Sequence, residues 1–177
     1  MIKRFALAGL STLLLTAAAS AHPGHGAGLL AGLAHPLTGL DHLVTMLAIG
    51  LWAALVGGRQ FWLIPVTFVC VLLAGAALGV AGVALPAAET LVLASAIAVS
   101  AFAIFRLRLP EAVSLGLAAS FALAHGLVHG AEMPVDASLA AYFAGFAAST
   151  IALHAIGMLA GRYLTSSTEV RAPRTTS

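Results

Sequence analysis

The sequence predicts an all-α, polytopic membrane helix bundle, made with a cleavable signal peptide and crossing the membrane with five transmembrane helices. Composition and the spacing of apolar runs both point to this class. Of the 177 residues, 61% are hydrophobic and 8% are charged, whereas a soluble domain carries roughly 25% charged residues. The few charges fall in short clusters between long apolar runs. Lipid can act as the solvent for so much apolar surface, and no basic patch is dense enough to bind nucleic acid.

The first 21 residues have the features of a secretory signal. Lys3 and Arg4 form a charged start, residues 5–18 are apolar but short for a span, and residues 19–21 are a small-residue cleavage site. The mature chain would then begin at His22. The alternative is an uncleaved first helix.

Five longer apolar runs follow, and each is close to the roughly 20 residues that a spanning helix needs. They cover about 37–56, 61–84, 87–105, 112–131 and 137–161. The breaks between them are short, so neighbouring helices should pack antiparallel in one bundle that occupies residues 22–164. The tail, residues 165–177, is rich in Ser, Thr and Arg and is expected to be a disordered cytoplasmic segment. The single cysteine, Cys70, lies inside a run and should behave as a small buried hydrophobe.

The basic residues predict the orientation. With the mature N-terminus outside, alternation of the five helices places every remaining basic residue on the cytoplasmic side, as the positive-inside rule requires. These residues are Arg59, Arg106, Arg108, Arg162, Arg171 and Arg174. Trp52 and Trp62 flank the first cytoplasmic break, where an aromatic belt is expected.

The remaining ionisable residues converge, on this topology, toward the external face. Ionisable groups in spanning segments are costly and usually mark a site or a pathway. His125, His129 and Glu132 are spaced i, i+4 and i+7 and therefore share one helix face. Asp41 and His42 lie in the first turns of the first helix. Imidazole with carboxylate suits Ni²⁺, Co²⁺ or Zn²⁺ better than Mg²⁺, Ca²⁺ or Cu⁺.

Two of these segments resemble a known family. Residues 35–42, HPLTGLDH, resemble the H-P-x-x-G-x-D-H signature of the HupE/UreJ family of nickel permeases, which are accessory to hydrogenases and ureases. Residues 125–132, HGLVHGAE, are similar to that family's second signature, H-G-x-x-H-G-x-E. By their match to the signatures, six residues inherit a metal role. These are His35, Asp41, His42, His125, His129 and Glu132.

The resemblance implies uptake of Ni²⁺, or alternatively Co²⁺, from the periplasm across the cytoplasmic membrane of a bacterium. The metal would be the transported substrate, with no permanently bound cofactor. Nickel-enzyme maturation proteins would be the partners, besides the lipid bilayer itself. The chain has no G-x-x-x-x-G-K-[ST] segment, so we expect a channel-like facilitator or a secondary transporter rather than an enzyme.

Further candidates lie outside the signatures' metal positions. Met46 is one turn from His42, Glu89 opens the third helix, and His154 lies deeper, where it could be an inner relay ligand. The last two candidates, His22 and His25, would form an external collector on a segment that Gly24, Gly26 and Gly28 make flexible.

Simpler interpretations and two other function classes remain open. Asp41 could cap a helix, Glu132 could be an exposed loop acid, and buried histidines could bond between helices or fill space. An intramembrane zinc-dependent hydrolase would use the histidines as zinc ligands and Asp41 or Glu132 as general base. A haem-binding electron-transfer membrane subunit would use paired histidines as axial ligands.

Overall fold

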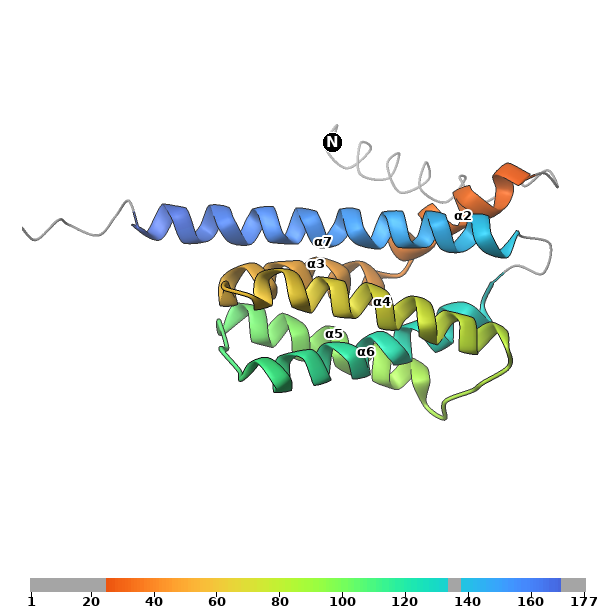
Figure 1. Cartoon of the computed structure of the whole chain (residues 1–177), viewed down its shortest axis with the longest axis horizontal. Coiled ribbons are helices and arrows are strands. Elements are labelled where there is room, and N and C mark those ends of the chain that lie inside the picture. The colour runs from red at the N-terminus through yellow and green to blue at the C-terminus, as the bar shows by residue number, and fades with distance from the viewer. Residues whose placement is uncertain (1–24, 134–137, 170–177) are drawn as a thin grey trace, which may run out of the picture.

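The computed structural model describes residues 25–133 and 138–169, which fold into six α-helices without a strand. These are α2 (His25–Thr38), α3 (Leu40–Val56), α4 (Gln60–Val80), α5 (Ala88–Ile104), α6 (Glu111–Ala131) and α7 (Leu139–Glu169). Helices α3 to α7 run alongside one another, and α2 projects at an angle from one end (Figure 1). The all-α prediction is confirmed. The predicted signal peptide, residues 1–21, lies outside the described residues, and α7 continues into the stretch predicted as a tail.

Several of the helices can cross a membrane. Three of them, α4, α6 and α7, are long and apolar enough to do so singly. Helices α2 and α3 together make a fourth candidate, bent by 82° at the break between them. Large apolar side chains such as Val66, Ile97 and Leu159 lie exposed on the bundle surface, which suits contact with lipid. Helix α5 has 17 residues and a length of about 25 Å.

Helix α2 was not predicted. Glycine lowers helix propensity, so the segment that contains Gly26 and Gly28 was expected to be flexible, and that prediction is wrong from residue 25 onward. The reason is packing against α7. A Cβ atom placed on Gly32 would lie 2.0 Å from the carbonyl oxygen of Tyr142. The glycines therefore bring the backbones of α2 and α7 into contact, and this tertiary packing outweighs the local cost.

Glycines also set the spacing between α4 and α6. A Cβ atom on Gly126 would lie 2.2 Å from the carbonyl oxygen of Leu72, and one on Gly130 would lie 2.0 Å from that of Ala76. Close backbone approach through small residues is a common mode of helix packing in membranes. In this chain it fixes the position of the half of α6 that carries His125 and His129.

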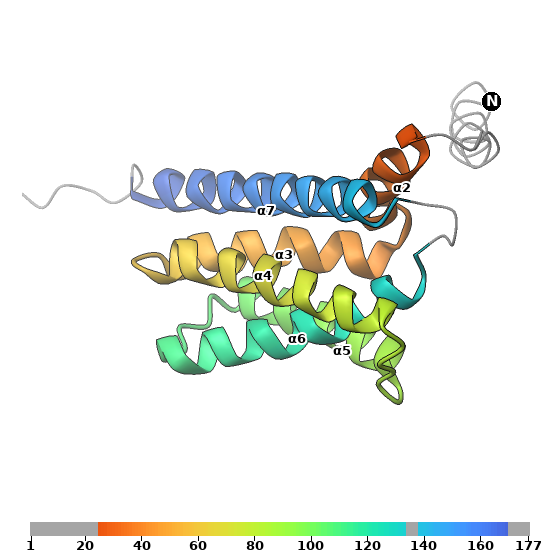
Figure 2. The same ribbon diagram turned by 45° about the vertical axis from the view of Figure 1, so that its right-hand side comes forward.

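The two ends of the bundle differ in chemistry. One end holds the α3–α4 and α5–α6 connections, where Arg59 pairs with Glu111 at 3.8 Å and Gln60 donates to the carbonyl oxygen of Leu109. The guanidinium of Arg162, near the end of α7, lies over the ring of Phe61 at this same end. The opposite end holds the α2–α3 bend, the end of α6 and the start of α7 (Figure 2).

Trp52 and Cys70 do not lie where the sequence predicted. Trp52 is fully buried and its indole N–H donates to the carbonyl oxygen of Leu107 at 2.9 Å, so it belongs to the core rather than to an aromatic belt. Cys70 is exposed on α4 rather than buried. Around both residues the helix is largely apolar on all sides, and hydropathy alone does not separate a lipid-facing side from a core-facing one.

Candidate metal site at one end of the bundle

Three segments of the chain meet at the end opposite the arginines. The end of α2 brings His35, the start of α3 brings Asp41 and His42, and the end of α6 brings His129 with Glu132 just beyond it. These side chains line a cavity of about 280 Å³ together with Thr38 and Gly39. The convergence expected from the sequence is therefore present. Asp41, Glu132 and the histidines 35, 42, 125 and 129 are called the histidine cluster below.

Glu132 joins two helices at the mouth of the cavity. Its Oε2 atom lies 3.2 Å from Nε2 of His35 and 3.8 Å from Nδ1 of His129. Ligand atoms from these three residues lie within 4.8 Å of one another. A metal with bonds near 2.1 Å needs ligand atoms roughly 3 to 3.5 Å apart, so a small inward movement of the side chains would complete a three-ligand group. Glu132 is half exposed whereas His129 is buried, so the group reaches from the surface into the bundle.

Asp41 orients the ring of His42. Its Oδ1 atom lies 2.7 Å from Nδ1 of His42 and also accepts the backbone N–H of His42 at 2.9 Å. A carboxylate can only accept, so Nδ1 of His42 carries the proton and Nε2 keeps a free lone pair. That Nε2 atom is buried and has no hydrogen-bond partner among the described residues. Metal-binding histidines are commonly held in this way by a carboxylate on the other ring nitrogen.

His125 has the same arrangement with a backbone acceptor. Its Nδ1 donates to the carbonyl oxygen of Phe121 at 3.0 Å, which leaves the Nε2 lone pair free and buried. Both ring nitrogens of His129 are buried, and neither has a hydrogen-bond partner within residues 25–133 and 138–169. The interpretation that these histidines bond between helices finds no such bond among the described residues. A group of buried, unpartnered imidazole nitrogens is unusual in a folded protein and indicates an absent ligand or a functional role.

The four rings lie close enough to pass an ion from one to the next. The ring of His129 is 4.6 Å from that of His35 and 4.2 Å from that of His42, measured between centroids. The ring of His42 is in turn 5.1 Å from that of His125. Side-chain exposure is 25% at His35, 13% at His42 and 1% at His129, and His125 is fully buried. The cluster is therefore graded in depth rather than arranged around one point.

Gly39 permits the bend that assembles the cluster. It separates α2 from α3, and a Cβ atom at this position would lie 2.8 Å from Nδ1 of His42 and 2.9 Å from Oδ1 of Asp41. A side chain here would push apart the pair that orients His42. Thr38 donates its hydroxyl to the carbonyl oxygen of His35 at 2.8 Å, which closes the end of α2. The packing of the site itself therefore favours glycine at position 39, within the first signature.

The other predicted candidates are scattered. Glu89 is exposed and lines a neighbouring cavity of about 410 Å³, which Glu132 also lines. Met46 is buried in the hydrophobic core and does not line the cluster cavity. His154 is buried on α7 and lines a different cavity, between α4 and α7. His25 begins α2, and His22 lies outside the described residues.

Two aromatic residues of α7 complete the walls, and sequence reasoning missed both. Phe146 packs its ring 4.6 Å from that of His129, and Tyr142 packs its ring 5.9 Å from that of His35. Both are fully buried. They lie within an apolar run and belong to neither signature, so only the folded arrangement places them at the site. The one available sequence signal was their spacing of four residues, which places both side chains on the same face of a helix.

Comparison with known proteins identifies a family and a curated relative. The family model described as HupE / UreJ protein matches residues 10–176. Protein HupE of Rhizobium leguminosarum bv. viciae is 41% identical to this chain over 150 residues, which are 84% of this chain and 78% of that protein. No solved structure matches the chain.

Proposed function

Because the chain belongs to the HupE/UreJ family, we propose that it carries a divalent transition-metal ion, Ni²⁺ or alternatively Co²⁺, from periplasm to cytoplasm for metalloenzyme maturation. The family is associated with nickel and cobalt uptake for hydrogenase and urease. The observation that carries the proposal is the set of buried imidazole nitrogens at one end of the bundle, which have no hydrogen-bond partner in the part of the chain that the structure describes.

The chemistry of the cluster supports a borderline metal ion as its substrate. Neutral imidazole with one or two carboxylates suits Ni²⁺ and Co²⁺, whereas Mg²⁺ and Ca²⁺ prefer all-oxygen sites. Glu132 and His35 at the mouth would attract the hydrated ion, and His129, His42 and His125 would replace its water in turn. A transport site must also release its ion. A graded row of ligands suits release better than a closed four-ligand site.

We propose that α3 to α7 form five spans in the cytoplasmic membrane and that α2 lies at the external face. Helix α5 is shorter than the roughly 30 Å hydrocarbon core, a mismatch that local thinning of the bilayer accommodates. The charge distribution supports the orientation. Arg59 and Arg162 lie at the end opposite the histidine cluster, so the positive-inside rule makes that end cytoplasmic.

Reporter fusions test the orientation. A fusion at Ser177 should be active with a cytoplasmic reporter and silent with a periplasmic one, because the arginine-bearing end stays inside. A fusion in the α4–α5 connection, at Ala84, is the matched control and should give the reverse pattern. The opposite result at both positions would place the histidine cluster on the cytoplasmic side and refute import through this mouth.

The test of transport is metal-resolved uptake. Cells that lack other nickel importers should accumulate Ni²⁺ or Co²⁺ when they produce this chain and not when they lack it. Purified protein in liposomes should give the same metal preference. Transport would be refuted if neither ion moved in either system. A haem absorption band or lipid hydrolysis by the purified protein would then favour the corresponding alternative function class.

Uptake should fall as the external medium is acidified. Histidine binds metal only when neutral. Burial lowers the pKa of His35 at the mouth below the ordinary histidine value of about 6.5, so its ring gains a proton and stops binding metal only at a pH below that value. We expect the initial rate of nickel uptake to change little between about pH 7.5 and about pH 6.5 and to drop as the pH falls further. The measurement uses liposomes of fixed internal pH with the membrane potential clamped. A rate that rises on acidification would indicate coupling to protons and contradict a passive facilitator.

A further inference from the structure

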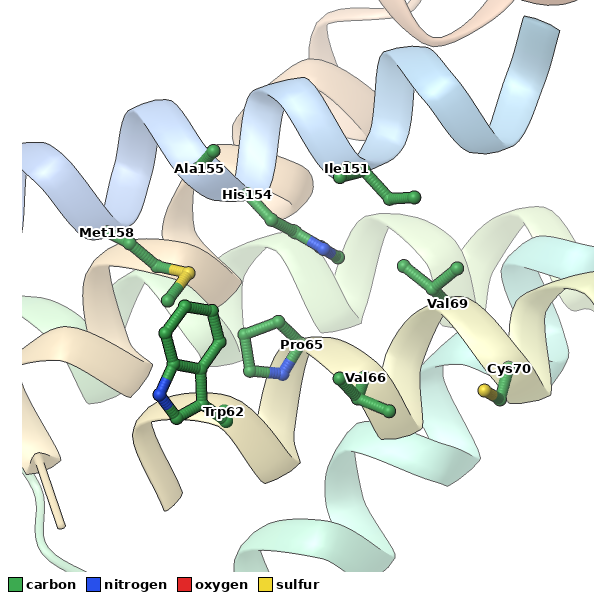
Figure 3. A pocket seen from close by; sticks show the side chains of 9 residues that line it. All are labelled: Trp62, Pro65, Val66, Val69, Cys70, Ile151, His154, Ala155 and Met158. Atoms are coloured by element: carbon green, nitrogen blue, oxygen red, sulfur yellow. The ribbon is translucent and has the colours of Figure 1, made fainter. Parts of the chain in front are cut away.

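Side chains of α4 and α7 form a groove on the outer surface of the bundle. It has a volume of about 270 Å³, and Figure 3 shows the side chains of the two helices on either side of it. Trp62, Val66 and Cys70 of α4 and Ile151 of α7 all line the groove, and all four are exposed. The groove therefore opens to the surroundings of the bundle and not to its core.

The accessible surface of this groove is apolar. No charged side chain lines it. His154 is one of its walls, but both ring nitrogens of His154 are buried and do not reach the groove surface. Such a surface offers no ligand to a hydrated ion, whereas it offers close van der Waals contact to a hydrocarbon chain.

The groove has nearly the length of one membrane leaflet. Along α4 it extends over eight positions, from Trp62 to Cys70, which is about 12 Å at 1.5 Å per residue. One leaflet of the roughly 30 Å hydrocarbon core is about 15 Å deep. Trp62 lies near the start of α4 at the arginine-bearing end and is 65% exposed, as is typical of a tryptophan at the membrane surface. The groove therefore runs from that membrane surface toward the mid-plane.

A basic side chain lies at the surface end of the groove. Arg162 follows Met158, a lining residue, by about one turn of α7. Its guanidinium lies 5.9 Å over the ring of Phe61, and that ring packs edge to face against the ring of Trp62 at 4.8 Å. Arg162 is exposed and forms no ion pair with a side chain that the structure describes. Its contact with Phe61 uses the face of the guanidinium and not the N–H fork that binds phosphate.

We propose that this groove binds an anionic phospholipid, with one acyl chain between α4 and α7 and the phosphate at Arg162. The apolar lining, the leaflet length and the unbalanced positive charge at the surface end all suit such a lipid. Arg59, by contrast, is already paired with Glu111. A second copy of the chain suits the groove less well, because a two-fold axis along the membrane normal would bring a second Arg162 to the same end, where like charges repel. The inference rests on the proposed spans and not on metal transport.

Brominated lipids test the proposal, because bromine atoms on an acyl chain quench tryptophan emission by contact. The full-length chain is placed in phosphatidylcholine nanodiscs that contain a small share of brominated phosphatidylglycerol or the same share of brominated phosphatidylcholine. The Trp62→Phe variant gives the emission of Trp52, which is fully buried. We expect brominated phosphatidylglycerol to occupy the site beside Trp62 about fivefold better, the preference that one arginine near the membrane surface provides.

Substitutions of arginine separate a bound phosphate from a general effect of charge. Arg162→Gln should remove the preference for phosphatidylglycerol, and Arg162→Lys, which keeps the charge, should retain most of it. Arg108→Gln is the matched control and should retain the full preference. Arg108 is exposed in the α5–α6 connection at the same end of the bundle and does not line the groove.

Substitutions of alanine test whether the acyl chain lies in the groove itself. Ala155 is exposed on α7 and lines the groove, so Ala155→Phe should fill it and lower the quenching of Trp62 by brominated phosphatidylglycerol. Ala152 is exposed on α7 outside the groove, and Ala152→Phe should leave the quenching unchanged.

Three results would overturn the proposal. The first is equal quenching of Trp62 by the two brominated lipids in the unaltered chain. The second is a preference that persists in Arg162→Gln or falls equally in Arg108→Gln. The third is a dimer linked through Cys70, the single cysteine, on mild oxidation in nanodiscs, which would assign the groove to a second copy. A chain that shows the lipid preference but moves no nickel would refute the proposed function alone.

Discussion

Replacing His129 with alanine is expected to abolish nearly all nickel uptake. His129 lies next to three other members of the cluster. Its ring contacts those of His35 and His42, and its Nδ1 approaches the carboxylate of Glu132. It is also buried, and neither ring nitrogen has a hydrogen-bond partner among the described residues, so the substitution removes a proposed ligand without breaking such a bond. Loss of groups that bind or orient a metal typically costs 10- to 100-fold in affinity or activity, and we expect about 100-fold here. Initial uptake of Ni²⁺ in cells lacking other importers measures the effect.

His42→Ala and Asp41→Asn extend this prediction. His42→Ala should match His129→Ala, whereas Asp41→Asn should lose less, about tenfold, because it leaves the imidazole in place and weakens only its orientation. Met46→Leu is the control, since Met46 lies one turn from His42 but in the core. All variants should be present in the membrane at similar amounts. Normal uptake by His129→Ala and His42→Ala would remove the cluster from the transport path.

The closeness of the residues in the histidine cluster could be predicted from the sequence because they come in two short local patterns. The spacing of His125, His129 and Glu132 places them on one helix face, and α6 has that face turned toward α3. The apolar runs likewise predicted where α3 to α7 lie in the chain. The shared helix face and the positions of the helices depend on helix periodicity and on the order of residues in short stretches of the chain. A single sequence contains this information.

What the sequence did not predict depends on contacts between distant segments. Helix α2 forms although its glycines disfavour it, because they allow its backbone to touch that of α7. Trp52 is buried in the core, where its indole N–H donates to the carbonyl oxygen of Leu107, 55 residues away in the sequence. Cys70 faces outward on a helix with no polar side to mark its orientation. Tyr142 joins the site only through the bend at Gly39, which brings His35 toward α7.

Replacing Gly130 with alanine is expected to disrupt the bundle itself. The added Cβ atom would lie 2.0 Å from the carbonyl oxygen of Ala76 and 2.9 Å from the backbone nitrogen of Val80. Real Cβ atoms do not approach backbone atoms this closely, and backbone cannot move aside as a side chain can. Helices α4 and α6 would have to separate along the stretch that positions His125 and His129. Overpacking typically costs about 1 to 3 kcal/mol and here should reach the upper part of that range.

Gly116 offers a matched control on the same helix. A Cβ atom placed there meets nothing within 4 Å, so Gly116→Ala should leave the packing unchanged. It should even stabilise α6 slightly, by up to about 1 kcal/mol, because alanine favours the helix more than glycine does. Thermal unfolding of the two purified variants should therefore shift in opposite directions, with Gly130→Ala lower by roughly 5 °C or more. Equal melting temperatures for the two variants would show that α4 and α6 do not make the close backbone contact on which the placement of His125 and His129 depends.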